Sequence, residues 1–221
     1  MDEKDTSRLE AFSDGVFAVA ITLLVLTIKV DAPPKLPDDA TLTRQLLSQW
    51  PMLLAFTTSF FTIGIMWLNH HRLFKHIKHT DTGLLFINLV LLFIVVFVPI
   101  PTALLAEYLV RTDQHVAAIL YNGTFLAIGC CMNQLWRHAS YRGRLLGKEL
   151  DLQGITAINR QYRFGPLLYL ITFGLAWINT PISIVFNLLL ALVFAAPGIP
   201  QISLPARFLA IFRKNHIDEQ R

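Results

Sequence analysis

Six long apolar blocks constrain this chain more than any other feature of its sequence. They cover about residues 8–30, 46–69, 83–106, 115–137, 162–178 and 182–204. A helix needs about 20 apolar residues to cross a bilayer, so five blocks have ample length and the block at 162–178 is short. A helix also bonds its own backbone groups, as lipid requires. The blocks predict an all-α membrane protein with six transmembrane helices in one domain, residues 1–221.

The composition excludes several other classes of protein. Hydrophobic residues make up 54% of the chain and charged residues 15%, whereas soluble domains have about 45–50% and 25%. A disordered chain would show the opposite balance. Nothing in the sequence resembles a phosphate-binding loop, a dinucleotide fingerprint or a zinc-protease motif. We therefore expect neither enzyme activity nor a cofactor.

The Lys and Arg residues indicate how the spans are oriented. If six spans place both termini on one side, fifteen of the nineteen Lys and Arg residues fall on that side. Positive charge gathers on the cytoplasmic side of membrane proteins. We therefore predict a multi-pass protein of the inner or plasma membrane with cytoplasmic N- and C-termini. Its longest cytoplasmic segment, 137–163, is basic and adjoins the bilayer, so its expected partner is lipid and not nucleic acid.

Prolines and asparagines inside the spans predict local features. Pro99 and Pro101 are expected to kink the outer end of the third span, because proline cannot continue the backbone hydrogen bonds of a helix. Asn88, Asn122 and Asn187 are expected to bond neighbouring helices, as buried asparagines in membranes commonly do.

The first span carries a carboxylate within an apolar run. Ser7 and Glu10 have the spacing of a capping box, which predicts that the helix begins there. Asp14 then lies roughly 10 Å along the helix axis. A carboxylate at that depth is unfavourable unless it is paired or hydrated. Asp14 is expected to bond another helix, or Arg8 of another subunit; a simple polar anchor at the helix end is the structural alternative.

One face of the same helix is almost entirely apolar. Gly15, Val19, Thr22, Leu23 and Leu26 share it by helical spacing. If several copies met around an axis, their apolar rings would make a narrow constriction, and Thr22 would supply its only side-chain oxygens. Ordinary helix packing is the alternative, and from the residues alone it is the commoner case, with the threonine bonded to its own backbone.

The end of the second span is rich in histidine. His71 and His79 are eight residues apart, and no carboxylate is placed beside them by spacing. Zinc or haem would need ligands on a shared face with supporting partners, so we predict no metal site. The segment is instead a basic membrane border with Trp67 at the interface. Trp67 and either His70 or His71 are expected to bond the polar start of the first span.

Both of these regions resemble the transmembrane protein 175 family of potassium channels. The residues that carry the resemblance are Arg8, Phe12, Ser13 and Asp14, followed by the run from Gly15 to Thr22, and then Trp67, His70 and Phe74. The chain has one set of six spans, which is similar to the prokaryotic members, whereas animal members have two. The resemblance implies a homotetramer in which the first helix of each subunit lines a central pore.

The resemblance also implies a role for each matching residue. Val19 stands at the constriction, where relatives often have Ile or Leu, and Leu23 and Leu26 form further apolar layers. Thr22 stands at the selectivity layer, near which potassium ions bind transiently without a resident metal. The structural motif that ties the first span to its neighbours comprises Arg8, Phe12, Ser13, Asp14, Trp67 and His70. The implied function is a potassium-selective leak channel of the cell membrane that lacks a TVGYG filter.

The residues leave two other functions open. A small secondary transporter would use Asp14 as its proton or cation site, because an ionisable group within a span is a natural carrier site. A membrane enzyme or metal-binding protein would be built on the histidines between residues 70 and 79. Proton-coupled flux would distinguish the first of these from a channel, and bound metal would identify the second.

Overall fold

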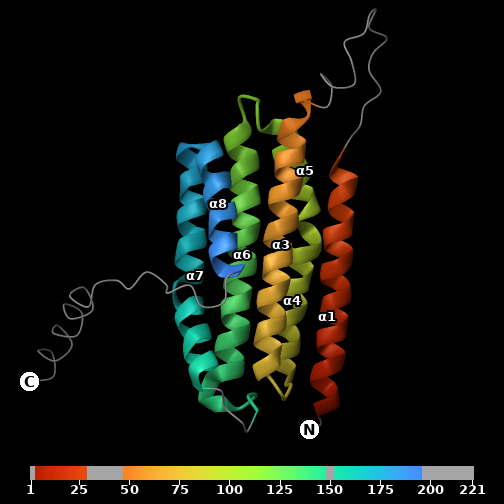
Figure 1. Ribbon diagram of the computed structural model, residues 1–221, viewed down its shortest axis with the longest axis vertical. Helices are drawn as coiled ribbons and strands as arrows, with labels where there is room; N and C mark the ends of the chain where they lie inside the picture. Colours follow the sequence, from red (N-terminus) through yellow and green to blue (C-terminus); the bar gives the residue numbers. More distant parts are fainter. Residues whose placement is uncertain (1–2, 29–46, 148–151, 196–221) are drawn as a thin grey trace, which may run out of the picture.

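The computed structural model describes residues 3–28, 47–147 and 152–195, which form a bundle of long helices with nearly parallel axes (Figure 1). The elements in chain order are α1 (Glu3–Leu23), the 3₁₀ turn η1 (Leu24–Thr27), α3 (Trp50–His76), α4 (Thr82–Phe97), α5 (Pro99–Tyr108), α6 (Gln114–Ser140), the 3₁₀ turn η2 (Tyr141–Gly143), α7 (Leu152–Ile178) and α8 (Thr180–Ala195).

The helices have the length and composition of a membrane protein. Four segments are long and apolar enough to cross a bilayer, and these are Thr6–Thr27, Trp50–His76, Thr82–Tyr108 and Gln114–Gly143. The shorter apolar helix α8 and the helix α7 complete the bundle. The predicted all-α membrane fold is thus confirmed, and the chain is a multi-pass membrane protein.

Helix α1 occupies one edge of the bundle, and α7 and α8 occupy the other (Figure 1). Among the described helices, α1 packs against α3 and α4, while α6 packs against α4, α5, α7 and α8. The large buried side chains Tyr121, Phe125 and Trp136 all come from α6. The core therefore centres on α6, and among the described helices α1 has neighbours on one side only.

The third membrane segment is broken at Val98, as its prolines predict. The Val98 amide donates at 3.2 Å to the Val95 carbonyl, three residues back, which closes a tighter turn than the usual α-helical bond to the fourth residue back. Pro99 then occupies the first turn of α5, where its missing N–H leaves no bond unmade. The helix resumes when the Thr102 amide bonds the Val98 carbonyl at 3.1 Å.

Helix α7 begins at Leu152, ten residues before the predicted start of the fifth span at residue 162. Its first turns are amphipathic: Ile155, Ile158 and Tyr162 pack against the core, while Arg163 is exposed. In the sequence this segment resembles a loop, because its arginines interrupt the helical spacing of the apolar side chains that become buried. The described parts of the predicted long cytoplasmic segment, 137–147 and 152–163, are therefore mostly helical.

The ends of the first and last spans also differ from the prediction. Helix α1 begins at Glu3, not at Ser7, because the acidic residues before Ser7 suit the first turn of a helix. Helix α8 begins at Thr180, two residues before the predicted start at 182, and only Asn179 separates it from α7, so the two form a tight hairpin. Residues 29–30 of the first predicted span and 196–204 of the sixth lie outside the described residues.

Buried asparagines join helices, as the sequence predicts. Asn122 on α6 donates to the Ser183 hydroxyl on α8 at 3.2 Å, and Asn187 on α8 donates to the side-chain Oδ1 of Asn122 at 2.9 Å. Asn133 on α6 donates to the Tyr162 carbonyl on α7. That carbonyl lacks its usual helical donor, because the residue four positions later is Pro166.

The loop between α3 and α4 is held by Asp81. Its carboxylate accepts the Leu84 amide at 2.7 Å, which caps α4, and the His138 ring at 2.9 Å. Arg144 lies 3.5 Å away. Burial acts to raise the pKa of Asp81, but the Leu84 amide, His138 and Arg144 together outweigh it and hold this pKa below its usual value.

Candidate functional site

A polar cluster joins α1 to α3 and α4, within otherwise apolar surroundings. Its central contact is between Asp14 on α1 and Trp67 on α3, where the indole N–H donates to the carboxylate Oδ1 at 2.8 Å. Both side chains are partly buried. A carboxylate near lipid needs such a donor, and the bond also fixes the rotation of α1 about its own axis.

Asn88 on α4 bridges the other two helices of the cluster. Its amide donates to the Ser13 hydroxyl at 2.9 Å, and its carbonyl lies 2.9 Å from Nε2 of His70. Because that carbonyl can only accept, the network assigns the proton to His70 Nε2. Ser13 in turn donates to the Leu9 carbonyl at 2.8 Å. The three side chains are fully or almost fully buried, so the chain of bonds is shielded from solvent.

Aromatic rings surround His70 on both sides. Phe74 stacks on it with 4.5 Å between ring centroids, and Phe17 of α1 lies 5.4 Å away. This packing holds the imidazole in the position that Asn88 requires. Trp67 and His70, both predicted from the sequence, therefore contact the start of α1 by different routes, one directly and one through Asn88.

A second polar pair lies one helical turn away. Nδ1 of His71 is 2.7 Å from a carboxylate oxygen of Glu10, and the His71 ring stacks on Trp67 with centroids 6.2 Å apart. Sequence reasoning missed the role of Glu10. The signal was the spacing: Glu10 and Asp14 are four apart on α1, as Trp67 and His71 are on α3, so two facing helices present matched pairs.

The remaining predicted residues of α1 lie on the opposite side of the helix. We call this side the outer face of α1. It consists of Arg8, Phe12, Gly15, Val19, Thr22 and Leu26, all of which are exposed in the subunit. Phe12 is 58% exposed, Val19 53% and Leu26 73%. Leu23, which was predicted on the same stripe, is only partly exposed, because it lies where the outer face turns toward the bundle.

The motif of the first span is thus divided between two faces. Ser13 and Asp14 bond α4 and α3, whereas Arg8 and Phe12 point away from the rest of the subunit. Thr22 donates its hydroxyl hydrogen to the Val19 carbonyl at 2.8 Å. Its oxygen lone pairs therefore remain available on the outer face.

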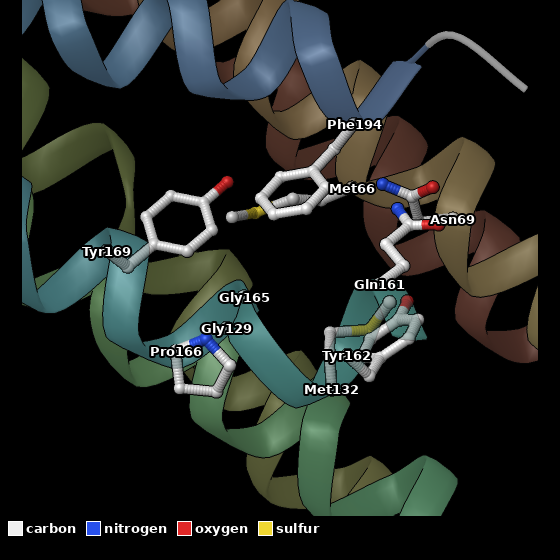
Figure 2. A pocket seen from close by; sticks show the side chains of 10 residues that line it. All are labelled: Met66, Asn69, Gly129, Met132, Gln161, Tyr162, Gly165, Pro166, Tyr169 and Phe194. Atoms are coloured by element: carbon white, nitrogen blue, oxygen red, sulfur yellow. The ribbon is translucent and has the colours of Figure 1, made fainter. Parts of the chain in front are cut away.

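A small cavity lies apart from these residues, among α3, α6, α7 and α8 (Figure 2). It has a volume of about 40 Å³, and Met66, Met132, Tyr169 and Phe194 give it a largely apolar wall. No residue of α1 lines it. The cavity is therefore separate from the outer face of α1 and from the polar cluster.

Comparisons with known proteins agree on one family. The family model of the endosomal/lysosomal potassium channel TMEM175 matches residues 8–99, which include the polar cluster and the outer face. A potassium channel of Chamaesiphon minutus is 50% identical over 194 residues, which cover 88% of this chain and 95% of the relative. A potassium channel of Streptomyces collinus is 42% identical over 205 residues, which cover 92% and 96%.

A solved structure agrees with the sequence comparisons. The crystal structure of a lysosomal potassium-selective channel TMEM175 homolog from Chamaesiphon minutus matches with a TM-score of 0.78 at 49% identity, over 87% of this chain and 97% of that chain. The relatives are named as channels, in agreement with the expectation that the chain is not an enzyme. Because the match to these relatives extends over nearly their whole length, the chain belongs to the TMEM175 family.

Proposed function

We propose that the protein is a potassium-selective leak channel, assembled as a homotetramer in which the outer face of α1 lines a central pore. The observation that carries the proposal is the division of α1 into two faces. One face is bonded to α3 and α4 through Asp14 and Ser13, while the other is exposed in the subunit. The two bacterial relatives that are named as potassium channels align with this chain over 88% and 92% of its length.

The character of the exposed residues supports a pore in preference to a lipid contact. Exposed positions on other helices carry large apolar side chains, such as Phe93 at 73% exposure on α4, and so does the outer face of α1, where Leu26 is equally exposed. The outer face of α1 also includes Gly15 and the hydroxyl of Thr22, and space is open around the Gly15 Cα. Small residues allow helices to approach closely in membranes, as a narrow pore of several α1 helices requires.

The same residues suggest how the pore controls ion flow. Four copies of Val19, with Leu23 and Leu26 beyond them, form apolar rings that close a pore by excluding water. Thr22 offers lone pairs to a cation, because its hydrogen is used by the Val19 carbonyl. One hydroxyl per subunit replaces only part of the hydration shell of an ion, so we expect a modest preference for potassium. The chain contains no TVGYG sequence.

The orientation we propose follows from charge. With both termini in the cytoplasm, fifteen of the nineteen Lys and Arg residues face the cytoplasm. The polar cluster then lies at the cytoplasmic end of α1, beside the mouth of the pore. The membrane is the cell membrane, with the bilayer itself and potassium ions as partners of the tetramer.

Reconstitution tests the proposal directly. Purified protein in planar bilayers, with potassium on one side and sodium on the other, should give single-channel steps that favour potassium. Val19→Asn should raise the conductance, because a polar ring wets the constriction. Val185→Asn on α8 is the matched control, since the two valines are 53% and 55% exposed. Absence of potassium current in both the parent and the Val19 variant would refute the channel.

The same recordings distinguish a channel from a secondary transporter. A secondary transporter would show saturable, proton-coupled flux that Asp14→Asn abolishes. Ohmic steps that persist without a proton gradient exclude that function. Asp14 already accepts a bond from Trp67, which agrees better with a structural role than with a carrier site.

A further inference from the structure

Three potential metal ligands converge where α1 meets α3. Glu10 and Asp14 come from α1 and His71 from α3, and each offers one ligand atom within 4.8 Å of the other two. All three side chains are partly buried. The two carboxylates are one helical turn apart on α1, so both lie on the face of α1 that packs against α3.

The nitrogen of His71 that faces this group is paired with a carboxylate. Nδ1 is shielded from solvent and lies 2.7 Å from a Glu10 oxygen. Two lone pairs at that distance would repel each other, so a proton lies between the two atoms. A cation bound by His71 and the carboxylates would take the place of this proton.

Trp67 orients two of the three ligands. Its indole N–H donates to Asp14 Oδ1 at 2.8 Å. Its ring stacks on His71. Metal sites commonly fix their ligands through such outer contacts.

We propose that Glu10, Asp14 and His71 bind a divalent transition-metal ion, with Zn²⁺ as the preferred ion. Mixed oxygen and nitrogen donors suit zinc, whereas Mg²⁺ and Ca²⁺ select oxygen ligands alone. Two carboxylates balance the charge of the ion, which matters at the edge of a membrane. The site ties α1 to α3 and leaves a fourth position for water, because the His71 side chain is 40% exposed and that of Glu10 25%.

Small side-chain rotations complete the geometry. Ligand atoms around tetrahedral zinc are about 3.3 Å apart, since each bond is about 2.0–2.1 Å long. The pair at 2.7 Å must therefore separate slightly, and the most distant pair, within 4.8 Å, must approach. The histidines between residues 70 and 79 do not form this site among themselves. Only His71 comes from that segment, and the other two ligands are carboxylates of α1.

Calorimetric titration of the full-length protein tests the proposal. The protein is purified without a His tag, stripped with a chelator and titrated with ZnCl₂. We expect one ion per subunit, and a loss of affinity of about tenfold or more in His71→Ala and in Glu10→Gln. His79→Ala and His115→Ala are matched controls outside the cluster, and both should bind as the parent does.

Cobalt provides a second measurement on the same variants. Co²⁺ in a site with three protein ligands gives visible absorption bands, which should be strong in the parent and absent in His71→Ala. Far-UV circular dichroism verifies that each variant is folded. The proposal is overturned if the parent binds no Zn²⁺, or if Glu10→Gln and His71→Ala both bind it with the affinity of the parent.

Discussion

The indole N–H of Trp67 on α3 donates to the carboxylate of Asp14 on α1 across 2.8 Å. This one bond connects the helix that we propose lines the pore to the helix beside it. Asn88 makes a second, more buried connection between Ser13 on α1 and His70 on α3. Together the two connections hold the face of α1 that packs on α3 and α4, so they fix the rotation of α1 and the direction of its outer face.

Trp67→Phe should destabilise the protein, because the Asp14 carboxylate loses its donor while remaining partly buried. We expect a loss of about 1–2 kcal/mol, or a decrease of about 2–8 °C in the unfolding temperature measured in detergent by circular dichroism. Trp177→Phe is the control, since Trp177 is 66% exposed. Equal unfolding temperatures of the two variants would show that the bond contributes nothing.

Much of the polar cluster could be predicted from the sequence, and the reasons are local. Asp14 interrupts an apolar run, and Trp67 and His70 end another, so each is conspicuous without knowledge of the fold. A bond from His71 to the start of the first span was one of the expected alternatives. Its partner Glu10 was not predicted, because a contact between helices depends on their relative height and rotation. Neither quantity is encoded in the spacing along a single helix.

The fold shows the same division between local and non-local information. The break at Val98 could be predicted because two prolines adjoin it. The early start of α7 at Leu152 could not, since its arginines resemble those of a cytoplasmic loop. Ile155 and Ile158 of that segment pack on the core, which supports the helix but depends on the fold.

Asn88→Ala should be more harmful than the loss of either of its partners. The change leaves Nε2 of His70 without an acceptor and removes the donor to Ser13. We expect a loss of about 2–3 kcal/mol, because a buried polar group is left unpaired. Ser13→Ala leaves only the Asn88 amide without its acceptor and should cost less, about 1–2 kcal/mol. Stability is measured by thermal unfolding in detergent. Gln134→Ala, on the exposed side of α6, serves as the control.

An Asn88→Ala protein as stable as Ser13→Ala would contradict this account. It would mean that His70 finds another partner once Asn88 is lost. A double-mutant cycle between positions 13 and 88 separates their direct contact from the rest of the network.

Asp81 should make stability sensitive to acid. Its pKa is lower in the folded protein than in the unfolded chain, so its contribution is complete above the unfolded pKa and is lost as the pH falls through the folded pKa. The unfolding temperature of the parent should therefore decrease below about pH 4. Asp81→Asn should be less stable at neutral pH by about 1 kcal/mol, since a helix cap is weakened, and its pH dependence should be shallower.

Asp113 provides the control for this pH series. It precedes α6 as Asp81 precedes α4, but its side chain makes no capping bond and is exposed. Asp113→Asn should therefore retain the acid sensitivity of the parent. If Asp81→Asn also retained it in full, the acid response would originate at another carboxylate.

Val19→Ile should reduce the potassium conductance. Each of four subunits adds one methyl group to the proposed constriction, and a narrower apolar ring excludes water more strongly. We expect a decrease of about twofold or more in single-channel current, measured in planar bilayers with symmetric potassium. Val185→Ile on α8 adds the same group at an equally exposed position outside the proposed pore, and it should leave the current unchanged. Equal currents from both variants would place the constriction at another residue of α1. Leu26→Asn would then be the next variant to record, because Leu26 is the most exposed large apolar side chain on the outer face.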